Sequence, residues 1–446
     1  MSKVSVEASN ESHTNKGLIR GIRRWDLVAI AINAVIGAGI FGLPSKVFSL
    51  IGSYSLIAFA VCALVVALIV LCFAEVGSRF TETGGPYVYA REAFGAVVGF
   101  EVGWLLWLVR LTAFAANCNL LVGYFGFFWP AATAGLWRGI VITTVVVALT
   151  LVNILGVRQA AITTNIFTIG KLVPIILFIA AGMFFVRPGN YTFAAVPSYG
   201  AFSQSVLLLV YAFTGFEMAG IPAGEVRDPR KNLPFAMLIA IAVVALIYIL
   251  IQLVCIGTFP GLAASQKPLA DAASQFLGPV GGAIISAGAL ISIVGNLNVV
   301  LLAGSRVPFA MAVQKELPSV FASTHKRFRT PHVSILISAA AVFVLTISGT
   351  FIYALTISTL TRLTTYAVTC AALPVLRRRA HDHPAQFVAP AGVFAAVAAL
   401  MLALWLLSNS TLTEARDSCI AAGAGLLIYF AYRLSLRSSK TGRPSS

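Results

Sequence analysis

The chain has 446 residues, of which 59% are hydrophobic and only 10% are charged. Soluble domains carry about a quarter charged residues, so this composition excludes a soluble globular protein and predicts an integral membrane protein. The formal net charge of +16 does not indicate a nucleic-acid partner, because the basic residues cluster in the loops and tails that flank apolar runs.

The apolar runs are long enough to cross a bilayer and predict an all-α membrane fold with twelve spans. In chain order these spans lie roughly at 26–50, 53–77, 93–125, 139–155, 163–186, 202–224, 235–258, 278–305, 331–348, 351–376, 386–407 and 418–434. The N-terminal segment is polar and basic and does not read as a cleavable signal peptide. We divide the chain into a tail at 1–25, spans 1–5 at 26–200, spans 6–10 at 201–376, spans 11 and 12 at 377–434, and a tail at 435–446.

Lysine and arginine are distributed unequally between the two predicted sides of the membrane. If the N-terminus lies inside, the outer loops contain only Arg138, Arg187, Lys267 and Arg416. The positive-inside rule then places both termini in the cytoplasm. Together with the compact chain, this predicts a multi-pass protein of the cell inner (plasma) membrane.

The first apolar run contains a glycine-rich break, Ala34-Val-Ile-Gly37-Ala-Gly39-Ile-Phe-Gly-Leu-Pro44. Each glycine costs about 1 kcal/mol relative to alanine inside a helix, so the helix is expected to unwind there. The second half-helix would then present free backbone N–H groups at its N-terminus, a favourable position for a carboxylate. The alternative is close helix packing through small residues, which is common in membranes.

A second break, Tyr211-Ala-Phe-Thr-Gly215-Phe-Glu217-Met-Ala-Gly-Ile-Pro222, lies five spans later. Because five is odd, the two halves would cross the membrane in opposite senses, as in an inverted repeat. Unwinding near 213–216 would leave carbonyl groups that suit an ammonium ion. One break offering donors and the other acceptors matches the two ends of an α-amino acid.

Ionisable residues inside the spans are candidates for function by default. Glu217 follows the second break and is either a proton carrier or a structural acid. Lys171 lies in span 5 and either pairs, loses its proton, or takes the place of a bound sodium ion. Arg110 in span 3 needs an anionic partner, carbonyl groups or a water-filled cavity. Glu217 and a substrate carboxylate are the possible anions, and a structural ion pair is the alternative to a functional role. Arg362 in span 10 is interpreted as a snorkelling or polar-face residue.

Aromatic residues flank the second break and offer a cover for a bound substrate, with ordinary packing as the alternative. Tyr211 is the stronger candidate because its ring also carries a hydroxyl group. The six cysteines lie in apolar runs without a CxxC pair. Four of the five histidines lie outside the spans, and His332 stands at the very start of the span at 331–348. We therefore expect no metal site, no cofactor and no intramembrane catalytic centre.

Several motifs together resemble the amino acid–polyamine–organocation (APC) superfamily over about residues 18–434. They are Gly37–Pro44, Thr214–Glu217 with Gly224–Pro234, and Arg306-Val-Pro-Phe-Ala-Met-Ala with Thr330-Pro-His332. The resemblance implies a LeuT-like inverted repeat with two extra helices, spans 1 and 6 being unwound, and movement of substrate by alternating access. Carried over by position, it implies substrate-binding roles for Ile36, Gly37, Ala38, Gly39, Ile40, Tyr211, Phe213, Thr214, Gly215 and Glu217.

At these positions, the backbone of span 1 would meet the substrate carboxylate. The backbone at Phe213 and Thr214 would meet the substrate amino group. Tyr211 falls at the position of a gating aromatic residue, and Glu217 at that of a proton-sensing glutamate in some relatives. Lys171 falls where proton-coupled and exchanging members hold a lysine instead of sodium. Arg110 departs from the family pattern and leaves the substrate class open.

The leading hypothesis is a sodium-independent amino acid transporter that works as a proton symporter or an exchanger. A polyamine or other organic-cation transporter is the alternative within transport, and a channel or an intramembrane enzyme are the other classes. The expected partners are an amino acid or amine, protons and the lipid bilayer. No covalently linked heavy chain is expected, since no cysteine lies at 126–138.

Overall fold

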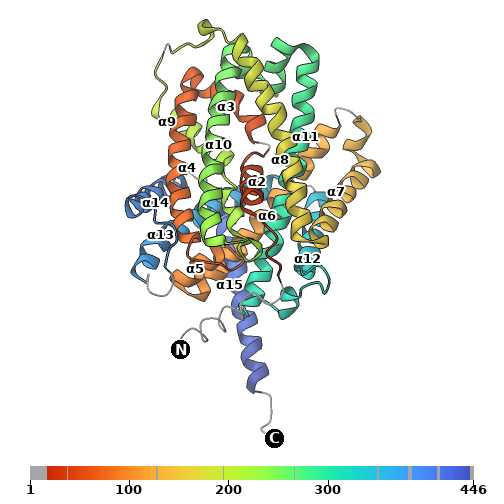
Figure 1. The fold of residues 1–446 in the computed structure, drawn as a ribbon, viewed down its shortest axis with the longest axis vertical. Coiled ribbons are helices and arrows are strands. Elements are labelled where there is room, and N and C mark those ends of the chain that lie inside the picture. Colours follow the sequence, from red (N-terminus) through yellow and green to blue (C-terminus); the bar gives the residue numbers. More distant parts are fainter. Residues whose placement is uncertain are drawn as a thin grey trace.

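The computed structural model describes residues 18–37, 39–126, 129–193, 195–265, 267–348, 351–379, 384–408 and 412–441. These residues form α-helices that run side by side as an elongated bundle (Figure 1). The α-helices are α2 (Arg24–Val35), α3 (Leu43–Ile51), α4 (Ser55–Gly77), α5 (Pro86–Phe94), α6 (Ala96–Phe125), α7 (Gly135–Leu155), α8 (Val157–Gly182), α9 (Tyr199–Phe213), α10 (Pro229–Thr258), α11 (Pro268–Val313), α12 (His332–Ser348), α13 (Phe351–Arg378), α14 (Gly392–Ser408) and α15 (Leu412–Thr441).

Short 3₁₀ helices connect these elements. They are η1 (Gly39–Phe41), η2 (Gly52–Tyr54), η3 (Pro130–Thr133), η4 (Met183–Phe185), η5 (Pro188–Asn190), η6 (Phe216–Gly220), η7 (Ala223–Glu225), η8 (Leu262–Ala264) and η9 (Ser319–Ala322). In the described part of the chain, β structure is limited to a bridge between Ile22 and Val226. The prediction of an all-α protein is therefore confirmed for the described residues.

Seven described helical segments are long and apolar enough to cross a membrane. They are Leu43–Gly77, Ala96–Gly123, Gly135–Leu155, Val157–Phe185, Pro229–Thr258, Pro268–Val313 and Arg416–Ser435. Three shorter apolar helices lie at Tyr199–Val210, His332–Ser348 and Gly392–Trp405. The chain is thus a multi-pass membrane protein, while the count of twelve spans stays a prediction.

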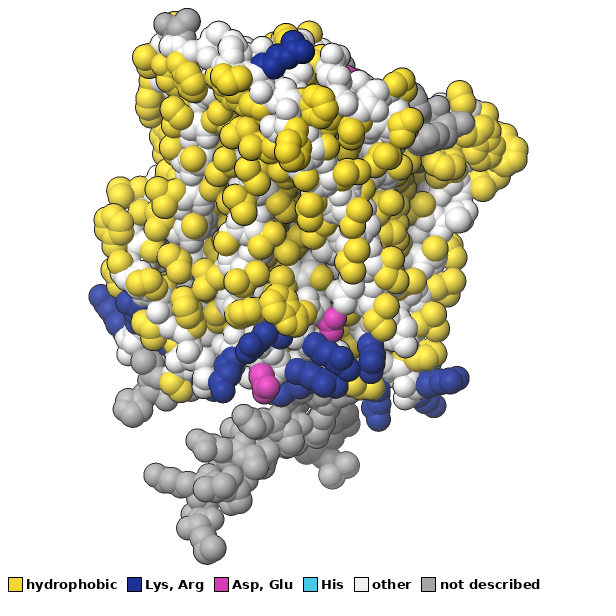
Figure 2. Space-filling view, turned by 45° about the horizontal axis from the view of Figure 1, so that its top comes forward, with side chains coloured by type: hydrophobic (Ala, Val, Ile, Leu, Met, Phe, Trp, Pro, Cys, Tyr) yellow, Lys and Arg dark blue, Asp and Glu magenta, His cyan; other side chains and the backbone are white. Residues whose placement is uncertain are grey.

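The bundle presents an apolar band to its surroundings (Figure 2). Large hydrophobic side chains on α7, α8 and α14 are exposed, among them Leu151, Ile166 and Phe394. In this view most of the visible lysine and arginine side chains gather at the lower end of the molecule, below the apolar band, although a basic side chain also lies at the upper end. Such a surface suits a hydrocarbon environment with one strongly basic flank.

The first glycine-rich segment separates two helices. The α2 helix ends at Val35, and Ile36 follows with φ −74° and ψ 84°, outside the helical region. The α3 helix begins at Leu43 with a proline in its first turn, where a missing N–H costs nothing. Between them the chain forms the short η1 helix, and Ala38 lies outside the described residues.

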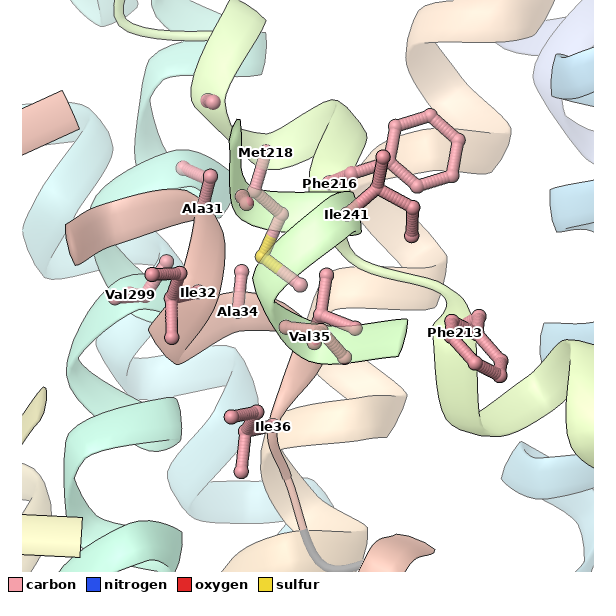
Figure 3. Close-up of a cluster of buried hydrophobic side chains, with 14 of the residues drawn as sticks. Ala31, Ile32, Ala34, Val35, Ile36, Phe213, Phe216, Met218, Ile241 and Val299 are labelled. Carbon is pink, nitrogen blue, oxygen red and sulfur yellow. The ribbon is translucent and has the colours of Figure 1, made fainter. Parts of the chain in front are cut away.

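The second glycine-rich segment packs directly on the first. The α9 helix ends at Phe213, and Gly215 then adopts φ 119°, which favours glycine. A Cβ atom at Gly215 would lie 2.4 Å from the carbonyl oxygen of Ala34, so a side chain does not fit. Figure 3 shows Met218 of η6 beside Ala34 and Val35 of α2. The ends of α2 and α9 therefore meet in the centre of the bundle.

Candidate functional site

A small cavity of about 50 Å³ lies where these two helix ends meet. Residues from α2, η1, α6, α9, η6, α11 and α13 surround it, together with the segments between α2 and η1 and between α9 and η6. The lining residues are Ala34, Val35, Gly37, Gly39, Ala113, Asn117, Ala212, Thr214, Met218, Asn296, Val300 and Arg362. The cavity thus touches both segments that the sequence singled out.

Of the predicted substrate-binding residues, Gly37, Gly39 and Thr214 line this cavity. Ile36 and Ile40 are fully buried nearby and are not among the lining residues. Ala38 and the side chain of Tyr211 lie outside what the structure describes. The predictions for these two residues therefore have no structural counterpart here.

The aromatic rings that follow Tyr211 pack within the core. The Phe213 ring meets Tyr248 edge-on at a centroid distance of 5.0 Å. The Phe216 ring lies 5.2 Å from Phe73 and 5.3 Å from Tyr366. Both rings are fully buried and neither lines the cavity, which agrees with the packing alternative.

The last carbonyl groups of α2 are almost all hydrogen-bonded by side chains from other helices. A helix end leaves four carbonyl groups without intrahelical partners, and burying them unpaired is costly. Lys171 of α8 is completely buried and donates from Nζ to Ile36 O at 2.5 Å, to Asn33 Oδ1 at 2.6 Å and to Asn33 O at 3.2 Å. The Lys171 Nζ group therefore caps the end of α2.

The remaining donors at this helix end come from α10 and α11. Asn296 donates to Ala34 O at 3.1 Å and accepts from Asn117 at 2.9 Å. Ser292 donates to Ile36 O at 3.2 Å, and Tyr248 donates to Val35 O at 3.2 Å. Sequence reasoning missed these four residues. Their signal is weak, because single polar residues in an apolar run occur on any helix–helix contact.

Glu217 is at the centre of a buried hydrogen-bonding group. Arg110 Nη2 donates to its Oε1 at 2.5 Å, and both side chains are 1% exposed. Its Oε2 accepts from the Gly215 N–H at 2.9 Å and from the Tyr366 hydroxyl at 2.8 Å. Of the partners proposed for Arg110, the structure contains Glu217. The tyrosine was not foreseen, since it lies 149 residues further along the chain.

Arg362 lies on the cavity wall and donates a hydrogen bond to the Thr214 hydroxyl. Its side chain is only 8% exposed. Of the two interpretations of Arg362, snorkelling to the membrane surface is therefore wrong, whereas a residue on the polar face of its helix agrees with this position. A snorkelling arginine extends to water, whereas this one turns inward to a polar helix break, and the sequence does not show which way a side chain turns.

In the described residues, no group of three or more histidine, cysteine or acidic side chains could hold a metal ion. The six cysteines form no disulfide bond with one another. The groups present at the site act by electrostatics and hydrogen bonding: backbone groups at two helix breaks, two arginines, one lysine and one carboxylate. Such a site can bind a small polar molecule and hold its charged ends.

Known membrane transporters resemble this chain over most of its length. The pattern of the amino acid permease family matches residues 22–430. The chain is 27% identical to the methylthioribose transporter of Bacillus subtilis (strain 168), covering 96% of this chain and 97% of that protein. It is 28% identical to the serine/threonine exchanger SteT of the same organism, covering 94% and 98%. It is 31% identical to an uncharacterized transporter of Mycobacterium bovis over 73% of each chain.

Proposed function

Because the chain belongs to the amino acid permease family of the APC superfamily, as its motifs predicted, we propose that it moves amino acids across the membrane by alternating access. It is a transporter and not an enzyme. Under this proposal residues 26–200 and 201–376 form the two inverted repeats, and 377–434 form two additional spans. Both termini lie in the cytoplasm, in agreement with the basic end of the surface (Figure 2).

The proposal rests on the cavity that both helix breaks border. Gly37 and Gly39 approach it from one break, and Ala212 and Thr214 from the other. The substrate α-carboxylate would meet the N–H groups that begin the second half of span 1, near Gly39 and Ile40. The ammonium group would meet the carbonyl groups at Phe213 and Thr214. A single zwitterion bound in this cavity would meet both segments.

The position of Lys171 supports transport without sodium. A sodium ion needs several oxygen ligands, and the carbonyl groups at a broken helix are a favourable source. Here the lysine ammonium group already occupies the oxygen atoms of Asn33 and Ile36. A fixed cation at this place takes over the charge that sodium would supply.

Proton coupling is assigned to Glu217. A proton on this carboxylate would remove the charge that holds Arg110 and would weaken the bond to Gly215 in the second break. Protonation would thus change both the backbone that meets the ammonium group and the charge beside the cavity. An exchanger would use the same contacts without net proton movement.

The polyamine alternative is less favourable on electrostatic grounds. A polycation prefers a pocket with several acidic side chains, and the cavity wall contains Arg362 instead. Arg110 pairs with Glu217 and is the second arginine in this region. Two arginines against one carboxylate repel a polycation.

Uptake and counterflow by the purified full-length protein in proteoliposomes test this proposal. Labelled serine, leucine, glutamate and agmatine would be offered with and without pH and sodium gradients. We expect amino acid accumulation against its gradient that sodium does not change. Accumulation of agmatine alone would favour the cation alternative, equilibration without accumulation would indicate a channel, and no transport of any compound would refute the proposal.

A further inference from the structure

We propose that the preferred substrate is an acidic amino acid whose side-chain carboxylate binds Arg362. This inference rests on the proposed function, because it concerns the side-chain part of the same amino acid site. It goes beyond that function by naming the charge of the substrate.

The charged side chains around the cavity are two arginines and one glutamate. Arg110, Arg362 and Glu217 lie close enough to one another for their charges to interact. With all three ionised, this cluster carries one net positive charge. Among the described residues that line the cavity, none is acidic, so the lining supplies no further negative charge.

All three charged side chains are buried. Arg110 and Glu217 are each 1% exposed, and Arg362 is 8% exposed. A net charge at this depth is costly unless an anion neutralises it. Arg110 raises the cost of this buried positive charge further, because its Nε and Nη1 atoms are buried and make no hydrogen bond. An anion that enters the cavity would lower this cost.

Arg362 lies where the side chain of a bound amino acid would be. In the proposed binding mode, both backbone ends of the amino acid have partners at the two breaks. Arg362 lines the same cavity and bonds to Thr214, the residue at the break that would receive the ammonium group. A carboxylate on a short side chain would reach Arg362 from there. A zwitterion with an uncharged side chain would bring no net charge and leave the cluster positive.

The size of the cavity agrees with a short side chain. Its volume is about 50 Å³. Ala34, Gly37 and Ala113 border it closely. These small bordering residues favour a short side chain, as in aspartate and glutamate, over an aromatic one.

The test compares isosteric substrate pairs. Wild-type protein in proteoliposomes would be assayed for inhibition of labelled substrate uptake by aspartate against asparagine and by glutamate against glutamine. Each pair differs in charge and hardly in size. We expect the acidic member to compete at least ~10-fold better, because only it supplies the missing negative charge.

Substitutions locate the effect. In Arg362→Gln we expect the preference to fall to ~1 or to reverse in favour of the amides, while Arg362→Lys retains most of it. Arg158→Gln removes the same charge from an exposed position on α8 and should leave the preference unchanged. Thermal unfolding of each variant in detergent separates altered recognition from misfolding, and the wild-type comparison does not depend on any variant.

The outcomes separate the two levels of the proposal. Transport of neutral amino acids without competition by aspartate or glutamate would overturn the charge assignment and leave amino acid transport intact. An unchanged acidic preference in a folded Arg362→Gln protein would overturn the role of Arg362. Failure of every amino acid to compete would instead refute the proposed function on which this inference rests.

Discussion

A lysine that caps a helix end is more than a neutral packing residue, because it satisfies backbone groups that no water reaches. In Lys171→Ala, the oxygen atoms of Asn33 and Ile36 lose a charged donor. We expect the initial rate of uptake to fall at least ~10-fold, since the end of α2 would lose the cation that fixes it. Lys231→Ala removes an exposed lysine and is the control. Wild-type rates and unchanged pH dependence in Lys171→Ala would remove the coupling role.

The carboxylate of Glu217 is a titratable group that contacts the second break, because it accepts a hydrogen bond from the Gly215 N–H. Glutamine preserves the shape of the side chain but cannot change its charge with pH. If Glu217 carries the coupled proton, Glu217→Gln is expected to flatten the pH–rate profile of uptake. The matched control is Glu92→Gln, whose carboxylate pairs with Arg91 on the partly exposed helix α5. A profile identical to that of the wild type would demote Glu217 to a structural acid.

At the scale of elements, the fit between the two breaks depends on one missing side chain. In Gly215→Ala the new Cβ atom would approach Ala34 O at 2.4 Å in a backbone conformation with φ 119°. We expect a clearly lower unfolding temperature and loss of uptake, since the left-handed conformation alone costs roughly 1–2 kcal/mol. Gly42→Ala is the control, because a Cβ atom there meets open space. Equal stability of the two variants would show that the contact does not matter.

The sequence was a good guide to the elements and a poorer guide to their contacts. Glycine and proline mark the ends of α2 and α9 because their backbone preferences act locally. Tyr366 and Arg362 come to Glu217 and Thr214 through packing of α13, which no local pattern encodes. The short helix α5 was also missed, as it is amphipathic and lies between two strongly apolar runs. Lys171 and Glu217 were found because charges stand out in apolar segments.

At the scale of the whole molecule, the alternating access that we propose would require that contacts at one end break when the site opens there. Arg306 of α11 holds Glu225 of η7 through two hydrogen bonds of 2.8 and 3.1 Å, and both side chains are at most 1% exposed. This pair joins the segment that follows the second break to the long helix α11. Nearby, Tyr87 and Arg91 of α5 bind Glu316 beyond the end of α11.

We expect Glu225→Gln to favour opening toward this end of the molecule. The substitution leaves Arg306 buried without its counter-charge, and loss of one partner of a buried pair costs about 3–5 kcal/mol. A state in which water reaches Arg306 avoids this cost, so its population should rise. Labelling of Ala113→Cys in the cavity by a membrane-impermeant maleimide, added from the basic side, measures the opening. The rate should rise several-fold in Glu225→Gln and stay unchanged in Glu92→Gln, which weakens a partly exposed pair. Equal rates in the two variants would mean that the Arg306–Glu225 pair does not hold this end closed.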